Sequence, residues 1–349
     1  MKMQARITFY KINRCGLYTR SRNGTALQPK FLGTKELLAD LSQWAIGKTL
    51  AHTDVFKNSQ NQGFCTYLAD IKSSTHSTIL VVWNQVPYTD AGVLSLPNNS
   101  TVGSIQQADA NSIMADSIPG YPTYFWFIPS LNVFATICFS TIVNGRAAME
   151  SYIKQFMKLY SQHVVKELDQ QTNTLVVKGY SKDPTDPQET VFKYPPVFSS
   201  HLYPLPQGLD VLKNKAPEIK KITKKATAEY RTKISKSLFQ KALGAFKGIQ
   251  RNPMASDVFT VKTEISMSNG LTAKEVQTLY DEWRNDVGSL HSLDYGFVID
   301  NEQFWFSHAL AKWEGDLALS FTEQNSFANI GLLLSELESK KSTILSIIS

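Results

Sequence analysis

A dense run of prolines divides this chain and limits what it can fold into. Between residues 182 and 206 the sequence carries Pro184, Pro187, the pair Pro195-Pro196, Pro204 and Pro206. Proline lacks the backbone N–H that helices and central strands need, so this density is typical of a stiff connector. A chain of 349 residues is long enough for two domains. We therefore expect an N-terminal α/β globular domain over 1–180, a connector over 181–212, and a C-terminal domain over 213–349.

The apolar patterns on each side of the connector mix strand and helix periods. Alternating apolar residues predict strands over 7–12, 64–72 and 78–84, whereas three- and four-residue steps predict helices after Thr34 and after Gly145. In the second half, a strand over 259–265 precedes a helix whose start, Thr272 to Glu275, matches a capping box. The predicted fold class is α+β, with mixed or antiparallel sheets and flanking helices.

The longest apolar stretch, from Tyr124 to Val143, has the length of a membrane-spanning helix but not its composition. It is rich in aromatic and β-branched residues, and Pro129-Ser130-Leu131-Asn132 interrupts it. This pattern predicts two buried strands joined by a short turn. The sequence also begins without the apolar region of a signal peptide, and its three cysteines lie far apart. We expect a cytoplasmic protein, membrane-associated only through a partner.

The basic residues are distributed very unevenly. Residues 213–251 carry twelve Lys or Arg and two acids, Glu218 and Glu229, which gives a local net charge of +10. The other 310 residues then hold 24 basic and 28 acidic residues, although the whole chain has a net charge of +6. A faintly anionic body with one strongly basic element indicates an anionic partner, and nucleic acid is the first candidate.

Placed on a helix over residues 218–236, the cations of this element would share one face. Pro217 suits the first turn of such a helix, and Ile219, Ile222, Ala226, Tyr230 and Ile234 would form the packed side. Like charges four residues apart repel by a few tenths of a kcal/mol, and phosphates would relieve this repulsion. The chain has no zinc-finger spacing, aromatic ribonucleoprotein motif or basic zipper, so we expect binding to be independent of sequence. The predicted DNA-binding residues are Lys213, Lys215, Lys220, Lys221, Lys224, Lys225, Arg231, Lys236, Lys241, Lys247 and Arg251.

One part of the sequence resembles a known family. The residues Gly120-Tyr121-Pro122-Thr123-Tyr124-Phe125, followed by Phe134-Ala135-Thr136 and Phe139, are similar to the hairpin of the phage-exclusion protein RexA of lambdoid prophages. The upstream Phe31-Leu32 before a Leu-rich helix also fits, and the segment from Ile219 to Ala226 looks like the family's Lys-rich stretch. The resemblance covers about a third of the chain.

The resemblance implies a function that the residues alone do not. It implies a cytosolic, homodimeric protein that binds double-stranded DNA and acts in anti-phage defence. It also implies a small integral-membrane effector as a partner, whose activation harms the infected cell. No cofactor and no metal are expected.

Two other functions remain open. The first is a Mg²⁺-dependent nuclease, because Asp70 and Lys72 lie at the end of a predicted strand with Asp54 or Glu36 upstream, and such enzymes need paired carboxylates and a lysine. The second is a non-enzymatic subunit whose basic element docks an acidic partner or anionic lipid. No phosphate-binding loop, GxSxG or HExxH motif is present, so we expect no catalytic residues.

Overall fold

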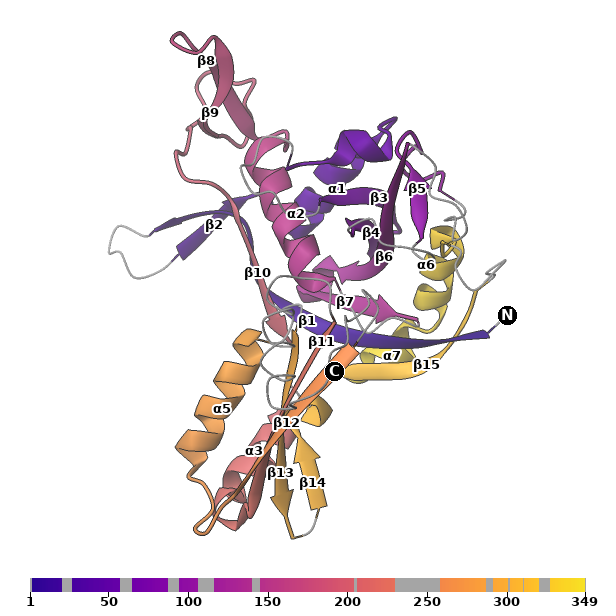
Figure 1. The fold of residues 1–349 in the computed structure, drawn as a ribbon. Helices are drawn as coiled ribbons and strands as arrows, with labels where there is room; N and C mark the ends of the chain where they lie inside the picture. Colours follow the sequence, from indigo (N-terminus) through magenta and orange to yellow (C-terminus); the bar gives the residue numbers. More distant parts are fainter. Residues whose placement is uncertain are drawn as a thin grey trace, which may run out of the picture. The chain divides into compact units, whose positions relative to one another are not determined.

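The chain forms two compact units, each of which contains helices and sheets. The computed structural model describes residues 2–20, 27–56, 65–86, 94–105, 116–139, 145–203, 206–229, 258–286, 291–300, 302–309, 311–319 and 327–348. The first unit takes in 1–200 and 314–343, and the second 201–313 and 344–349. The predicted α+β class is confirmed, because helices flank sheets whose paired strands run mostly antiparallel (Figure 1).

The first unit is built on a sheet in the order β10-β1-β7-β6-β4-β3. In addition, β2 and β15 pair with β1, and β5 pairs with β6. The strands are β1 (Lys2–Arg20), β2 (Leu27–Phe31), β3 (Thr66–Ser73), β4 (Thr78–Gln85), β5 (Ser95–Pro97), β6 (Ser117–Ile128), β7 (Val133–Cys138), β10 (Val197–Leu202) and β15 (Lys312–Ala318).

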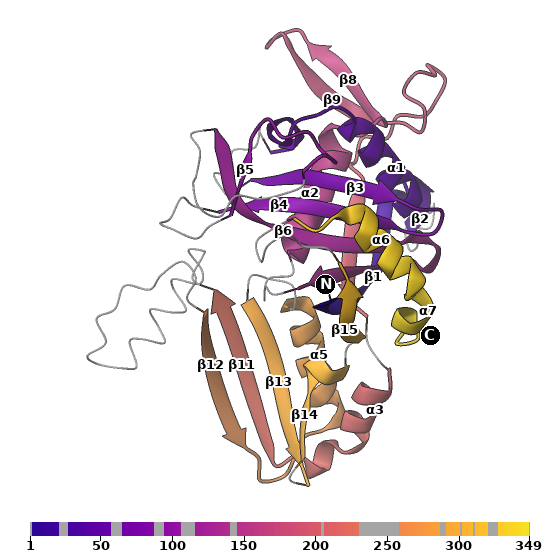
Figure 2. The same ribbon diagram turned by 90° about the vertical axis from the view of Figure 1, so that its right-hand side faces the viewer.

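Helices cover both faces of this sheet. Figure 2 shows α6 (Ile330–Ser339) on one face, whereas α1 (Thr34–Ala45) and α2 (Arg146–Leu159) lie on the other. A strand covered on both faces is apolar at successive positions rather than at alternate ones. The central strand β4 has this pattern, since Ile79 to Trp83 are all fully buried.

The predicted apolar hairpin is confirmed as β6 and β7. Its turn is the short 3-10 helix η2 (Pro129–Leu131), and Asn132 closes the turn in the left-handed conformation. The two strands pair from Tyr124 opposite Ile137 to Ile128 opposite Val133. In the described part of the chain, no helix combines the length and the apolar character that a membrane crossing requires.

The expected connector holds more regular structure than its prolines suggest. A ribbon of β8 (Val164–Asp169) and β9 (Thr174–Tyr180) precedes it and stands out from the sheet of the first unit (Figure 1). Within the connector, β10 joins the main sheet beside β1, and α3 (Pro206–Asn214) begins at a proline. β10 contains no proline, and α3 tolerates its proline because the first turn of a helix needs no N–H partner there.

The second unit is a four-stranded sheet with helices on one face. Its strand order is β12-β11-β13-β14, as Figure 2 shows. The strands are β11 (Lys221–Glu229), β12 (Val258–Ser266), β13 (His291–Ile299) and β14 (Glu302–Trp305). With α3 and α5 (Ala273–Asp286), the described elements follow the order helix, inner strand, outer strand twice. The remaining short elements are η1 (Leu50–Thr53), η3 (Ala216–Glu218), η4 (Phe306–Ala309) and α7 (Lys341–Leu345).

An aromatic cluster fixes which face of this sheet the helices cover. Phe306 packs against Phe297 of β13, with ring centroids 4.7 Å apart, and against Trp283 of α5 at 5.3 Å. Tyr280 of α5 and Tyr295 of β13 join the same cluster. Alternate residues of a strand point to opposite faces, so the β13 face that carries Tyr295 and Phe297 is the helix face.

The predicted helix over 218–236 is wrong in the part that the structure describes. Residues 216–218 form the short η3, and β11 then runs from Lys221 to Glu229, paired with β12 on one side and β13 on the other. Its sequence, KITKKATAE, carries β-branched residues at 222, 223 and 227, which favour strands. Lysines every three to four residues suggested a helix, but pairing between two strands overrides this weak preference.

The boundary between the units also differs from the expected one. It lies near residue 200, inside β10, and residues 314–343 return to the first unit. The return cannot be read from local composition, because α6 packs on β3 and β4, which lie far from it in sequence.

Candidate nucleic-acid interface

The basic residues of β11 divide between the two faces of the second sheet. Lys224 stands directly opposite Tyr295 of β13 and therefore shares the helix face. Lys221 and Lys225 stand opposite Val298 and Asp294 and therefore share the other face, which we call the open face. The open face also takes in Lys262 and Glu264 of β12 and Trp305 of β14.

Lys224 is neutralised within the unit. Its Nζ lies 3.0 Å from a carboxylate oxygen of Glu282 on α5 and 5.2 Å from the ring centroid of Tyr295. Hydrogen bonding to Tyr295 and to Glu282 raises the pKa of Lys224, and the bond from Lys224 lowers the pKa of Glu282. This lysine ties β11 to α5, so it is not available to a ligand on the open face.

On the open face, two lysines share one carboxylate. Glu264 accepts ion pairs from Lys262 at 2.7 Å and from Lys221 at 3.2 Å. The hydrogen bonds from Lys262 and Lys221 lower the pKa of Glu264. All three side chains are at least two-fifths exposed, so these contacts are screened by water and compete weakly with another anion.

Lys225 is the least compensated cation that the structure describes on this face. It is exposed and stands directly opposite Lys262 across β11 and β12. Its other neighbour is Asp294, whose carboxylate instead accepts the backbone N–H of Ser307 at 3.0 Å. Burial raises the pKa of Asp294, although the hydrogen bonds from Ser307 oppose the shift. Like charges opposite each other destabilise a sheet, and a bound anion would relieve the repulsion.

An aromatic ring lies beside these lysines. Trp305 stands opposite Gly296, and a Cβ on Gly296 would lie 3.0 Å from three atoms of its ring. The indole therefore lies over the glycine and toward Thr223, which is fully buried on the next strand. A side chain at this position would press against the ring, so the glycine allows the indole to lie close to the sheet. The open face thus combines a partly exposed indole with flanking cations.

The other predicted interface residues do not lie on the open face, or lie outside the described part of the chain. Lys213 lies in the last turn of α3 and is half-buried, Lys215 follows this helix, and exposed Lys220 precedes β11. The remaining predicted residues lie outside the part that the structure describes: Arg231, Lys236, Lys241, Lys247 and Arg251. Sequence reasoning missed Lys262 and Trp305, because only the strand register brings them beside Lys225.

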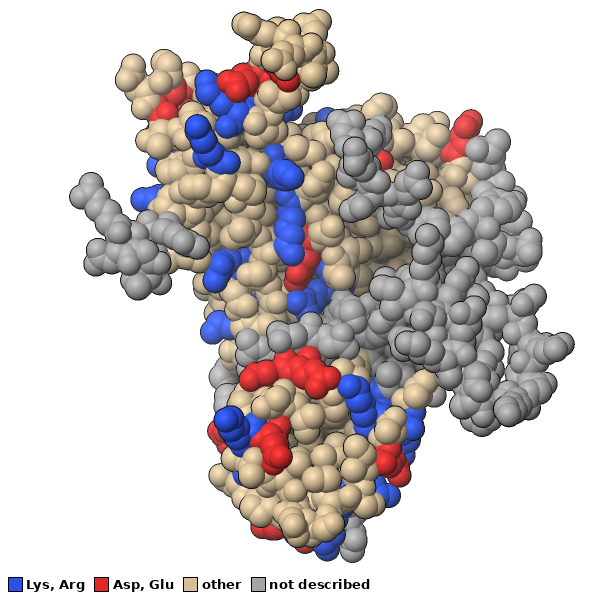
Figure 3. Space-filling view, turned by 60° about the vertical axis from the view of Figure 1, so that its left-hand side comes forward, with Lys and Arg blue, Asp and Glu red and all other residues tan. Residues whose placement is uncertain are grey.

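The first unit also carries cations on its surface. Figure 3 shows blue side chains that follow one another along a line broken by a red one. On α2, the four-residue spacing of Arg146, Glu150, Lys154 and Lys158 places these residues in such a stripe. Lys158 is exposed, but the rest of the stripe is used within the fold.

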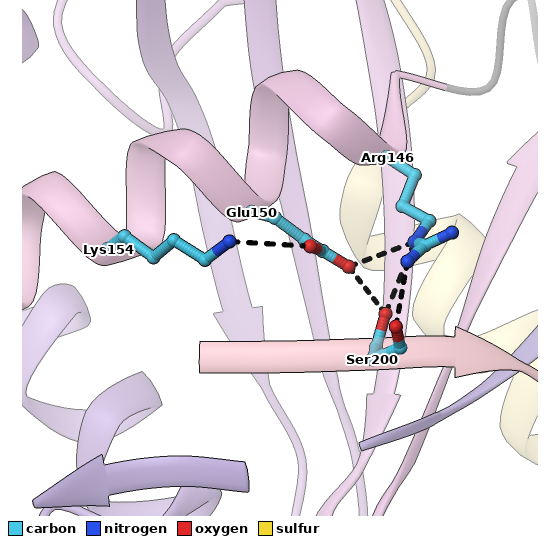
Figure 4. A network of polar contacts seen from close by, with 4 residues as sticks. All are labelled: Arg146, Glu150, Lys154 and Ser200. Carbon is cyan, nitrogen blue, oxygen red and sulfur yellow. Dashed lines mark hydrogen bonds and ion pairs between the residues drawn. The ribbon is translucent and has the colours of Figure 1, made fainter. Parts of the chain in front are cut away.

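Figure 4 shows how the stripe is used. Arg146 contacts Glu150 at 2.9 Å and donates to the backbone oxygen of Ser200 at 2.8 Å, whereas the hydroxyl of Ser200 donates to Glu150. Lys154 lies 3.7 Å from the other oxygen of Glu150. Arg146 also stacks on Tyr10 of β1, and only 12% of its side chain is exposed. This network fastens β10 to α2, so we assign it a structural role.

The residues of the nuclease alternative are also used locally. Asp70 follows an irregularity in β3, and burial raises the pKa of its carboxyl, whereas Lys72 is exposed. Glu36 accepts the N–H groups of Leu32 and Gly33 before α1, and Asp54 accepts that of Phe56. Among the described residues, no three His, Cys, Asp or Glu side chains gather closely enough to hold a metal ion.

Comparison with known proteins assigns no relatives to this chain. It matches no protein-family model, no curated protein and no solved structure at a significant level. A function for this chain must therefore be inferred from the residues of the open face.

Proposed function

We propose that this protein binds double-stranded DNA, independently of sequence, through the open face of its second unit. The observation that carries the proposal is the cross-strand pair Lys225 and Lys262, two exposed cations held opposite each other. Two like charges opposite each other destabilise a sheet. Binding of the pair to a phosphate backbone is favourable, because it releases counterions from the nucleic acid.

The sequence adjoining this pair supports the proposal. Residues 230–257 join β11 to β12 and carry six Lys or Arg and a single acid, Asp257. Lys225 lies four residues before the end of β11, which is roughly 13 Å at about 3.3 Å per residue. A phosphate backbone bound at Lys225 therefore lies within reach of chain that carries further cations.

The test removes charge from the open face without altering the strand pairing. We expect the double variant Lys221→Gln, Lys225→Gln to bind a mixed-sequence duplex at least about tenfold more weakly at 0.1 M salt, since each lost phosphate contact costs nearly one power of ten there. The matched control is Lys35→Gln, Lys274→Gln, which removes two exposed lysines from the first turns of α1 and α5. If both double variants bind as the unaltered protein does, the open face is not the interface.

The indole on the same face favours a second candidate, single-stranded nucleic acid. A ring lying flat between lysines is a platform on which an unpaired base can stack, a contact worth about 1–3 kcal/mol. Substitution Trp305→Ala separates the candidates, because it weakens binding of a single strand by about fivefold or more and leaves duplex binding unchanged. Equal loss for both ligands would instead indicate that the sheet itself had been disturbed.

The cellular role follows from the resemblance rather than from the site. We propose that the DNA-bound protein senses phage infection or phage DNA and signals to a small integral-membrane partner. The measurement is the efficiency of phage plating on cells that carry this gene together with any small membrane-protein gene encoded beside it. Protection should fall with the Lys221→Gln, Lys225→Gln variant, and undiminished protection would separate defence from DNA binding.

A further inference from the structure

The outer edge of β12 ends the second sheet. Among the described residues, β12 pairs only with β11, from Lys221 opposite Ser266 to Glu229 opposite Val258. A nine-residue edge strand presents a row of backbone donors and acceptors that another strand can pair with. Such edges are commonly blocked by prolines or short length, and β12 has neither.

The hydrogen-bond pattern shows which residues offer their backbone at this edge. The N–H of Met267 donates to the carbonyl of Lys220 at 2.8 Å, in register with the ladder between β11 and β12. Because these groups alternate along a strand, the odd-numbered residues of β12 bond to β11. The even-numbered residues 262, 264 and 266 therefore turn their N–H and C=O groups outward.

The sequence of β12 complements itself when the strand is reversed. If Thr263 stands opposite Thr263 of a second copy, Lys262 faces Glu264 of that copy and Val261 faces its Ile265. The sequence extends the match, because Thr260 then faces Ser266 and Phe259 faces Met267. Opposite charges, Thr–Thr pairs and apolar pairs are the cross-strand contacts that stabilise antiparallel sheets. In this register the outward backbone groups of 262 and 264 bond each other directly.

Two exposed apolar side chains lie along the same edge. Ile265 is 57% exposed and Val261 is 37% exposed, both on the helix face of the sheet. In the reversed pairing each would be covered by the other in the second copy. A charged edge can also serve to prevent association, but a lysine and a glutamate placed symmetrically about Thr263 attract a reversed copy rather than repel it.

We propose that the protein forms a two-fold symmetric dimer in which β12 pairs antiparallel with β12 of a second copy, centred on Thr263. Residues opposite each other share a face, so the two sheets join into one with both open faces on the same side. The lysines of the two open faces then form a single, longer cationic surface.

The experiment measures the mass of the full chain in solution, without nucleic acid, by sedimentation equilibrium. We expect a dimer of the 39.1 kDa chain at micromolar concentrations. Substitution Lys262→Glu places like charges opposite each other, as does Glu264→Lys, so each variant alone should be monomeric. Mixing the two variants should restore the dimer, because every charged pair is then again of opposite sign.

Three outcomes would overturn the proposal: a monomeric unaltered protein, a dimer that either substitution leaves intact, or a mixture that remains monomeric although circular dichroism shows both variants folded. The test is distinct from that of DNA binding. The Lys221→Gln, Lys225→Gln variant keeps Lys262 and Glu264 and should remain a dimer whether or not it binds DNA.

Discussion

Asp294 shows how the surroundings of one partly buried carboxyl group affect its ionisation. It stands between the backbone of Ser307, which donates to its carboxylate, and the exposed Lys225 on the neighbouring strand. Burial raises its pKa above the ordinary Asp value of 3.8, although hydrogen bonds from Ser307 oppose the shift. The Asp294 carboxylate is thus bound by backbone N–H groups rather than by Lys225, which leaves the ammonium of that lysine exposed to an external anion.

The substitution Asp294→Asn tests whether burial raises the pKa of Asp294, through the pH dependence of the free energy of unfolding. Because the pKa of Asp294 is raised in the folded state, the folded protein binds the carboxyl proton more tightly than the unfolded chain does. The free energy of unfolding of the unaltered protein therefore decreases as the pH rises and Asp294 ionises. The asparagine keeps the acceptor for Ser307 and cannot ionise. The free energy of unfolding of the variant, relative to the unaltered protein, should therefore increase between about pH 4 and pH 7, by about 1.4 kcal/mol for each unit of displaced pKa. Urea titrations at both pH values measure it, and a difference that falls with pH would show that Asp294 is stabilised as an anion.

At the scale of elements, the sequence predicted the helices and the hairpin whose formation depends on neighbouring residues. The β6–β7 hairpin and helices α1, α2 and α5 lie where apolar periods and capping residues placed them. The strand β11 was misread, because its lysines fit a helical stripe and only pairing with β12 and β13 shows that they alternate between faces. Lys221 and Lys225 could thus be named from composition, whereas Lys262, Glu264 and Trp305 could not, since strand register is not local.

The start of α5 provides a stability prediction at this scale. Thr272 accepts the N–H of Glu275 at 3.2 Å, and Glu275 accepts the N–H of Thr272 at 2.8 Å, which confirms the predicted capping box. Substitution Thr272→Ala should lower the free energy of unfolding by about 1 kcal/mol, measured by urea denaturation. The control Thr278→Ala, at an exposed position within the same helix, should be neutral or stabilising because alanine favours helix. Equal losses at both positions would contradict a specific role for the cap.

At the scale of the whole molecule, the basic residues that the structure describes have different uses. Arg146 and Lys154 hold elements of the first unit together, and Lys224 ties β11 to α5. Lys221, Lys225 and Lys262 remain on a sheet face that no described helix covers, with Glu264 shared between two of them. The proposed interface therefore lies on the open face of the second unit, because the described part of the basic element is a strand rather than a helix.

The salt dependence of DNA affinity tests this claim most directly. For a mixed-sequence duplex, the logarithm of the binding constant should fall linearly with the logarithm of salt concentration, with a slope of about 0.9 for each phosphate neutralised. The Lys221→Gln, Lys225→Gln variant should show a slope shallower by about 2, the contribution of two phosphate contacts, whereas the Lys35→Gln, Lys274→Gln control should keep the slope of the unaltered protein. Parallel lines for all three proteins, or no binding at low salt, would contradict the account.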